Sequence, residues 1–61
     1  MKASIYDLMF PDVAPMEIPD VKRVEYISNI LVIGYEGSDG KEHTYSIHMD
    51  STQYKRKVVF E

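Results

Sequence analysis

The chain has 61 residues, carries ten acidic and seven basic side chains for a formal net charge of −3, and contains no cysteine. A chain of this length forms one domain at most, here residues 1–61, and buries only about 60% of its unfolded surface. The absence of cysteine excludes a disulfide framework and a thiolate metal site, and two histidines are too few for a structural zinc. Stability must therefore come from tight packing or self-association.

The sequence contains no apolar segment of the length that a membrane requires. Asp7 interrupts the first apolar residues before a signal-peptide core could form, and no later window approaches a membrane span. The modest negative charge is sufficient for solubility. We therefore expect a cytoplasmic protein without a membrane partner.

Residues 4–10 have the pattern of a short helix. Ser4 is suited to the N-cap, and Asp7 lies where the helix dipole favours a negative charge. The apolar residues here follow helical spacing: Ile5, Leu8 and Met9. Pro11 then ends the pattern. Because one or two turns are not stable alone, we expect this apolar stripe to pack on a sheet.

Residues 11–20 contain three prolines at four-residue spacing, Pro11, Pro15 and Pro19. Polyproline II has three residues per turn, so these prolines do not line one face, and the PxxP spacing of recognition ligands is missing. The segment also carries apolar residues that a solvated linker would lack: Val13, Met16 and Ile18. We expect an ordered strap that leads from the helix across the sheet.

Residues 21–61 are rich in β-branched and aromatic residues that alternate with polar ones. This pattern predicts a four-stranded antiparallel meander with strands at about 22–28, 30–36, 42–49 and 54–60. With the helix and strap packed on one face, the predicted fold class is α+β, mostly β.

The middle hairpin has the clearest register. A three-residue loop at Ser38-Asp39-Gly40 keeps apolar residues opposite one another, and Gly40 can adopt the left-handed conformation that this loop requires. The loop predicts three cross-strand pairs: Tyr35 with His43, Ile33 with Tyr45, and Leu31 with Ile47.

The two outer hairpins follow from the same test. A tight turn at Ser28-Asn29 predicts the pairs Ile27 with Ile30, Tyr26 with Leu31, and Val24 with Ile33. The polar segment 50–53 predicts a turn that pairs Met49 with Tyr54, Tyr45 with Val58, and His43 with Phe60. Together these registers assign a core face to the following residues: Val24, Tyr26, Leu31, Ile33, Tyr35, Tyr45, Ile47, Met49, Tyr54, Val58 and Phe60.

The opposite sheet face is the predicted functional surface. Its apolar residues lie beside a polar and basic strip, and we predict a partner or dimer interface at Ile27, Ile30, Val32, His48, Lys55 and Lys57. The leading hypothesis is a small non-enzymatic binding protein, an inhibitor or adaptor, that acts through this face or through an exposed strand edge. One alternative is a structural or regulatory homo-oligomer, such as a homodimer, with the same face as its interface. A further possibility is that the sheet curls into a half-barrel and buries Ile30 and Val32 itself.

Other functions have weaker support in the sequence. Lys55, Arg56 and Lys57 could contact phosphate, but they alternate across a strand in an acidic chain, so protection of a sheet edge is favoured over nucleic-acid binding. His43 and His48 lie on opposite faces of a strand and cannot share a metal. The sequence also lacks a nucleophile with a nearby base and a glycine-rich phosphate loop. We therefore expect no enzyme, cofactor or metal site.

Overall fold

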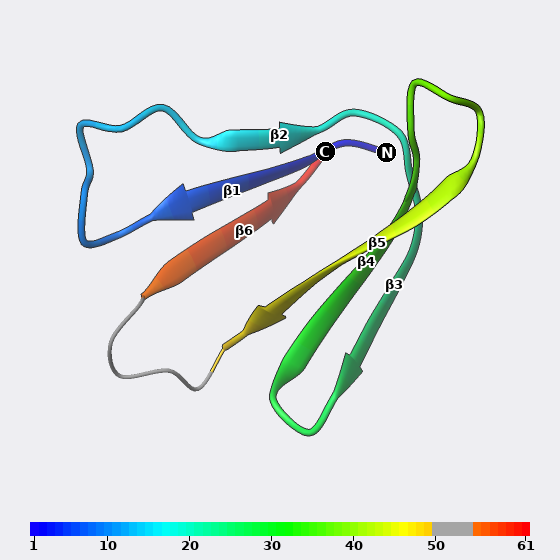
Figure 1. The fold of residues 1–61 in the computed structure, drawn as a ribbon. Helices are drawn as coiled ribbons and strands as arrows, with labels where there is room; N and C mark the ends of the chain where they lie inside the picture. The colour runs from blue at the N-terminus through cyan, green and yellow to red at the C-terminus, as the bar shows by residue number, and fades with distance from the viewer. Residues whose placement is uncertain (50–54) are drawn as a thin grey trace.

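The computed structural model describes residues 1–49 and 55–61 and contains six strands. They are β1 (Ala3–Asp7), β2 (Met16–Ile18), β3 (Val21–Ile27), β4 (Ile30–Glu36), β5 (Glu42–His48) and β6 (Arg56–Phe60). They form two antiparallel three-stranded sheets, with strand orders β2-β1-β6 and β3-β4-β5 (Figure 1). The described residues contain no helix, so the fold is all-β.

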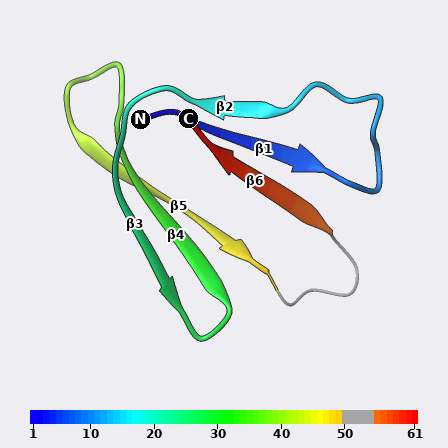
Figure 2. The ribbon, with the colours of Figure 1, turned by 180° about the vertical axis from the view of Figure 1, so that it is seen from behind.

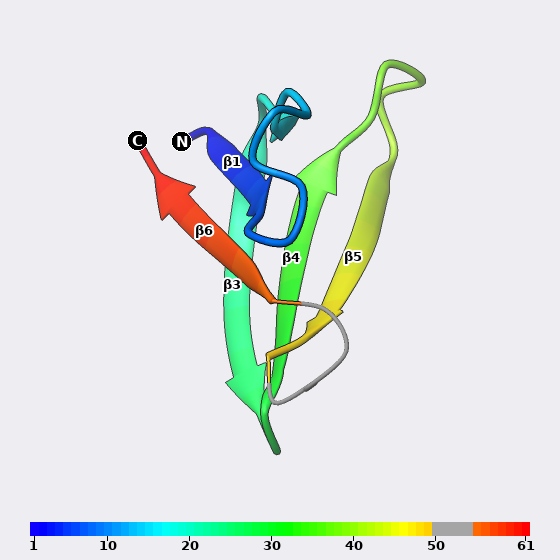
Figure 3. The same ribbon diagram turned by 90° about the vertical axis from the view of Figure 1, so that its left-hand side faces the viewer.

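The two sheets face each other across a small core, and their strands cross rather than align (Figure 3). Ile33 and Ile47 from the β3-β4-β5 sheet are fully buried. Both sheets contribute to the buried cluster, which consists of Ala3, Ile5, Ile18, Val21, Leu31, Ile33 and Ile47. Tyr35, Tyr45 and Val58 pack against it from its margins. This core replaces the expected single sheet covered by a helix.

The two chain ends meet at the corner where the sheets join (Figure 2). Lys2 and Glu61 exchange both backbone hydrogen bonds, at 2.9 and 2.8 Å. The Val21 N–H donates to the Met1 carbonyl at 2.8 Å, which ties the start of β3 to the same corner. The first and last residues are thus part of the hydrogen-bonded structure.

The predicted helix over residues 4–10 is wrong, because Ala3–Asp7 forms strand β1. β1 pairs with β2 on one side and β6 on the other. Ile5 is buried in the core, whereas Leu8 and Met9, which completed the helical stripe, are exposed. A central strand has bonding partners for its backbone on both edges and buries one face, which an isolated turn of helix cannot match.

The predicted four-stranded meander is also wrong, because β6 pairs with β1 instead of β5. Val58 lies opposite Ile5 and Phe60 opposite Ala3, so the expected partners Tyr45 and His43 have no β6 neighbour. The half-barrel does not form for the same reason. The β2-β1-β6 sheet supplies an apolar surface that covers Ile33 and Ile47, which favours this pairing. The expected turn at 50–53 and the partner of Met49, Tyr54, lie outside the described residues.

The registers predicted within residues 21–49 are confirmed. β3 pairs with β4 through Ile27↔Ile30, Tyr26↔Leu31 and Val24↔Ile33. β4 pairs with β5 through Leu31↔Ile47, Ile33↔Tyr45 and Tyr35↔His43. The turn at Ser28 and Asn29 has φ values of 50° and 65°, the positive pair of a type I′ turn.

The loop glycine has its expected role, but the strap does not lie across a single sheet as expected, because its residues 16–18 form the edge strand β2 of a second sheet. Gly40 has φ 77° and donates its N–H to the Gly37 carbonyl at 3.0 Å. The strap returns to the core through Ile18 in β2 and then leads into β3. Val13 and Met16 of the strap remain exposed.

Burial predicts a large stability difference between isoleucines of the same sheet. Ile33→Ala should lower the free energy of unfolding by about 2–5 kcal/mol, since it leaves a cavity between the sheets. Ile27→Ala is the matched control, since Ile27 is 60% exposed, and should change it by less than about 0.5 kcal/mol. Urea unfolding followed by circular dichroism measures both. Equal effects would contradict the core as described.

Cysteine pairs test the β1–β6 pairing directly, since the chain has no cysteine of its own. Asp7 and Arg56 face each other without shared backbone hydrogen bonds, a pair type with Cα atoms about 4.5 Å apart. Asp7→Cys with Arg56→Cys should therefore form an intrachain disulfide on mild oxidation. Ser46→Cys with Lys57→Cys would do so only in the four-stranded meander, and we expect that pair to stay reduced. Mass spectrometry under non-reducing conditions distinguishes the two results.

Candidate functional site

The structure separates the predicted interface residues into two groups. Ile27, Ile30 and His48 lie in one cross-strand row on the outer face of the β3-β4-β5 sheet, with Val32 on the same face. We refer to these four residues as the Ile27 patch. Lys55 and Lys57 do not join it, because Lys57 belongs to β6, where it lies opposite Tyr6 of β1, and the Lys55 carbonyl, just before β6, accepts a hydrogen bond from the Leu8 N–H. The predicted apolar and basic surface is therefore not continuous.

The Ile27 patch is a small apolar area on a mixed face. Ile27 is exposed, but Ile30 and Val32 are half-buried by their neighbours. The other end of the face carries charges: Arg23 Nε lies 3.2 Å from Glu25 Oε1, and Arg23 Nη1 lies 4.0 Å from Glu42 Oε1. Gly34, between Arg23 and Glu42, leaves space for this contact. The sheet face alone thus has little apolar area to offer a partner.

Strand β5 presents a different surface, its outer backbone edge. The Gly37 N–H donates to the Lys41 carbonyl and the Met49 N–H donates to the Asn29 carbonyl, both at 2.9 Å. In this register the odd-numbered residues of β5 bond to β4. The N–H and C=O groups of Thr44 and Ser46 therefore point away from the sheet. We call these outward groups, together with those of Glu42 and His48 at the strand ends, the β5 edge.

The opposite situation holds at β2, where prolines protect the edge. Because Lys2 and Glu61 share both hydrogen bonds, Ser4 bonds to β6, while Ala3 and Ile5 bond to β2. Glu17 then points outward, and alternation places its flanking prolines 15 and 19 on that side as well. Proline has no N–H, so this edge offers a partner strand little to bond. The four-residue spacing of the prolines therefore suits edge protection.

The remaining two edge strands carry other protective features. β3 has a bulge between Val21 and Arg23 and the charged side chains of Lys22, Arg23 and Glu25. β6 begins with the cations Arg56 and Lys57, directly after Lys55. Bulges and cations on an edge strand both oppose edge-to-edge pairing.

Strand β5 has none of these features. It contains no proline, lysine or arginine, and it pairs with β4 without a bulge. Its outer-face side chains, Glu42, Thr44, Ser46 and His48, are exposed. Among the described residues no backbone group bonds to the β5 edge, and Figure 3 shows no strand beyond it. The β5 edge is thus the least protected sheet edge of the described chain.

An apolar cleft opens next to β5 on the inner side of the sheet. Its volume is about 420 Å³, and its walls come from the strap end and β2 on one side and from the β4–β5 hairpin on the other. Tyr35, Tyr45, Ile18 and Met16 provide apolar lining. A side chain on the inner face of an added strand would approach this cleft beside Tyr45.

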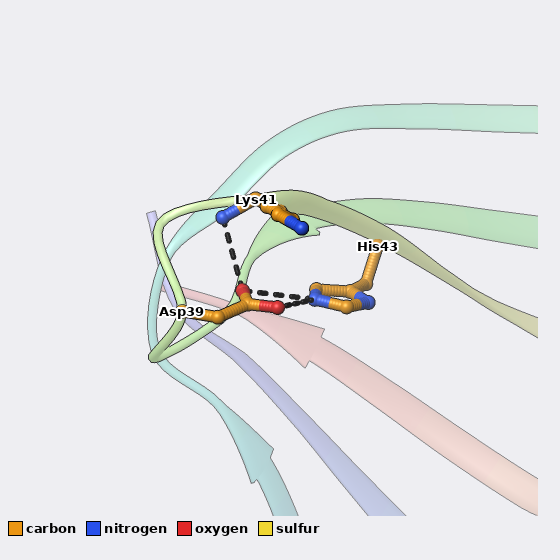
Figure 4. Close-up of polar contacts among 3 residues, drawn as sticks. All are labelled: Asp39, Lys41 and His43. Carbon is orange, nitrogen blue, oxygen red and sulfur yellow. Dashed lines mark hydrogen bonds and ion pairs between the residues drawn. The ribbon is translucent and has the colours of Figure 1, made fainter.

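The β4–β5 loop contains a cluster of polar contacts among Asp39, Lys41 and His43 (Figure 4). The Lys41 N–H donates to Asp39 Oδ1 at 3.0 Å, and His43 Nε2 lies 3.1 Å from both Asp39 carboxylate oxygens. The His43 ring stacks on Tyr35 with centroids 5.7 Å apart. A Cβ on Gly37 would come within 2.6 Å of the His43 ring, so glycine lets the ring lie over the turn.

This cluster has a structural explanation. Asp39 bonds the backbone of its own loop, and His43 connects that carboxylate to the stacked Tyr35. The Lys41 N–H, and after it the His43 ring, hold the pKa of Asp39 below its ordinary value of 3.8. Asp39, His43 and Tyr35 thus stabilise the hairpin that positions β5.

Two further findings concern the described residues. They include no group of three or more His, Asp or Glu side chains placed to hold a metal ion. Within the same part of the chain, no helix is long and apolar enough to cross a membrane.

Comparisons with protein-family models, with curated proteins and with solved structures each found no match to this chain. The candidate site therefore depends on its geometry alone.

The β5 edge was missed from the sequence because β6 was expected to cover it. The signal that could have found it is the contrast between the strands: one carries basic residues, one is flanked by prolines, and Glu42–His48 has neither. Using this difference also requires knowledge of which strands lie at the sheet edges, and the edges depend on how distant strands pair.

The Asp39 cluster predicts a low carboxyl titration midpoint. In a pH titration by NMR, the Asp39 carboxyl should titrate below 3.8. Its stabilisation of the fold should be complete above the unfolded pKa and disappear as pH falls through the lower folded pKa, because the unfolded state binds the proton more tightly. His43→Ala should raise the midpoint only partly, since the Lys41 N–H remains. Lys41→Ala keeps the backbone N–H and is the control, so its Asp39 pKa should stay low. A full return of the Asp39 pKa to 3.8 in His43→Ala would show that the His43 ring, and not the Lys41 N–H, is the main cause of the shift.

Proposed function

We propose that this chain is a small non-enzymatic binding protein, of the inhibitor or adaptor kind, that binds an extended polypeptide strand along the β5 edge. The observation that carries the proposal is the contrast among the four edge strands. β2, β3 and β6 each have flanking prolines, lysine or arginine residues, or a bulge, whereas β5 has outward hydrogen-bonding groups and none of these features. The proposal keeps the cytoplasmic location expected from the sequence.

The chemistry of the edge specifies the kind of partner. The outward N–H and C=O groups of Thr44 and Ser46 recur at strand spacing, which an extended chain can match and a helix or a nucleic acid cannot. Side chains of the added strand on the inner side would meet the apolar cleft beside Tyr45. Those on the outer side would lie beside Thr44 and Ser46, which are exposed and polar. We therefore expect a partner segment with apolar and polar residues in alternation.

The other hypotheses have less structural support. Docking on the sheet face would have to rely on the Ile27 patch, of which Ile27 is the well exposed apolar residue. Nucleic-acid binding would rely on Lys55 and Lys57, yet β6 lies beside a strand that carries Asp7 opposite Arg56. The β5 edge requires neither a large apolar face nor a basic surface.

Amide hydrogen exchange with a model strand tests the proposal. The probe is a capped peptide of alternating threonine and valine, about eight residues long to match a strand, with a lysine at each end. It should slow exchange at the Thr44 and Ser46 amides, which have no bond to β4. The Tyr45 and Ile47 amides, already bonded to β4, and the outward Glu17 amide on the proline-flanked edge are internal controls and should not change.

The matched variant adds to β5 the kind of protective cation that other edge strands carry. Thr44→Lys places a cation on the edge without touching the core and should abolish the protection. Lys22 lies on β3, so Lys22→Ala should have no effect. With the chain at a concentration where it sediments as a monomer, protection that appears at β3 or β6 instead, or no protection at millimolar peptide, would refute strand addition at β5.

A further inference from the structure

We infer that the strand that binds the β5 edge is β5 of a second copy of this chain, antiparallel to the first about a two-fold axis at Tyr45. This inference rests on the proposed function, because it assumes that the β5 edge accepts a strand. It names the partner and the register, which strand addition alone does not.

The backbone limits the registers that a symmetric pair can adopt. Only the even-numbered residues of β5 direct their N–H and C=O groups outward, so in the dimer even residues must face even residues. For two antiparallel copies, this places the axis at a residue. The axes that retain most of the seven-residue strand pass through Thr44, Tyr45 or Ser46.

Side-chain pairing selects the axis at Tyr45. This register sets Glu42 opposite the partner's His48 and Thr44 opposite the partner's Ser46, and symmetry repeats both pairs. A carboxylate facing an imidazole and a hydroxyl facing a hydroxyl are favourable cross-strand pairs. An axis at Thr44 would place Glu42 opposite Ser46 and leave His48 beyond the partner strand. An axis at Ser46 would place Thr44 opposite His48 and leave Glu42 beyond it.

The inner side of the same register is also compatible with pairing. Tyr45 faces its own copy in a position without shared hydrogen bonds, where side chains lie closest. The Tyr45 side chain is only half-buried in one copy, and the cleft beside it provides space for a second ring. A tyrosine pair here would cover apolar surface that a single copy leaves exposed.

Symmetry makes this contact self-limiting. Each copy has a net charge of −3 when histidine is counted as neutral. On that count Glu42 is the one ionised residue of β5, and the register places it opposite a histidine of the partner instead of another acid. A two-fold contact uses the same edge on both copies and closes, so it forms a dimer and not a fibre. The expected product is a continuous six-stranded sheet with the order β3-β4-β5-β5-β4-β3.

Interchain disulfides report the register. Chains with Thr44→Cys and chains with Ser46→Cys are mixed in equal amounts and oxidised mildly; both positions are exposed and the protein has no other cysteine. The Tyr45 axis predicts that the mixed 44–46 disulfide predominates. Predominant 44–44 or 46–46 disulfides would indicate another axis and overturn the register. A Lys22→Cys chain on β3 is the control for random collision and should remain reduced.

Charge exchange provides a second, independent readout. Sedimentation of Glu42→Lys chains should show a dimer dissociation constant about 2- to 30-fold higher, since two symmetry-related pairs are lost. Combining Glu42→Lys with His48→Glu places opposite charges across the axis and should recover the dimer. Failure of the double variant to recover would overturn the pairing of these two residues.

The outcomes separate this inference from the proposed function. A monomer at all concentrations up to the millimolar range, with Thr44 and Ser46 still protected by the threonine–valine peptide, would overturn the second copy as the partner and leave strand addition intact. A monomer with no peptide protection would overturn both. A dimer that leaves the Thr44 and Ser46 amides unprotected would use another surface and overturn the inference.

Discussion

The pairing of β6 with β1 is the interaction on which the rest of the structure depends. It brings the last strand beside the first, and Lys2 and Glu61 complete it with two backbone hydrogen bonds. The resulting sheet covers Ile33 and Ile47, the most deeply buried side chains of the other sheet. Two crossed sheets then share one core, which a 61-residue chain without cysteine needs for its stability.

The same pairing determines where the sheets end. A strand that joins β1 cannot also cover β5, so β5 becomes an edge. A two-sheet structure of this kind has four edge strands, each with outward backbone groups that could attract another chain. Prolines flank one edge, a bulge and charges lie on the second, and cations lie on the third. β5 has no proline, lysine, arginine or bulge, and this contrast gives the proposed function its physical basis.

The β4–β5 hairpin connects stability to this edge. Its turn is braced by Asp39, which bonds the Lys41 backbone and lies against the His43 ring, while that ring stacks on Tyr35. The pairing of β5 with β4 has no bulge, so the outward backbone groups of Thr44 and Ser46 keep the regular two-residue spacing of a strand. The contacts within the turn therefore support the β4–β5 pairing, and that pairing positions the proposed binding edge.

Local chemistry explains which parts of the fold were predictable. The two hairpins within residues 21–49 follow from a type I′ turn at Ser28-Asn29 and a loop with Gly40 in the left-handed region, and alternation then sets every pair. Residues 4–10 were misassigned because Ile5, Leu8 and Met9 fit a helical period, while Ala3 and Ile5 fit a strand period equally well over so short a stretch.

The candidate site divides in the same way. The sequence alone placed Ile27, Ile30, Val32 and His48 on one face, because side-chain alternation within a hairpin is a local property. It wrongly placed Lys55 and Lys57 on that same face, and it did not reveal the β5 edge. Only the tertiary structure decided these, since the choice between β1 and β5 as the partner of β6 depends on which pairing buries more apolar surface between distant segments.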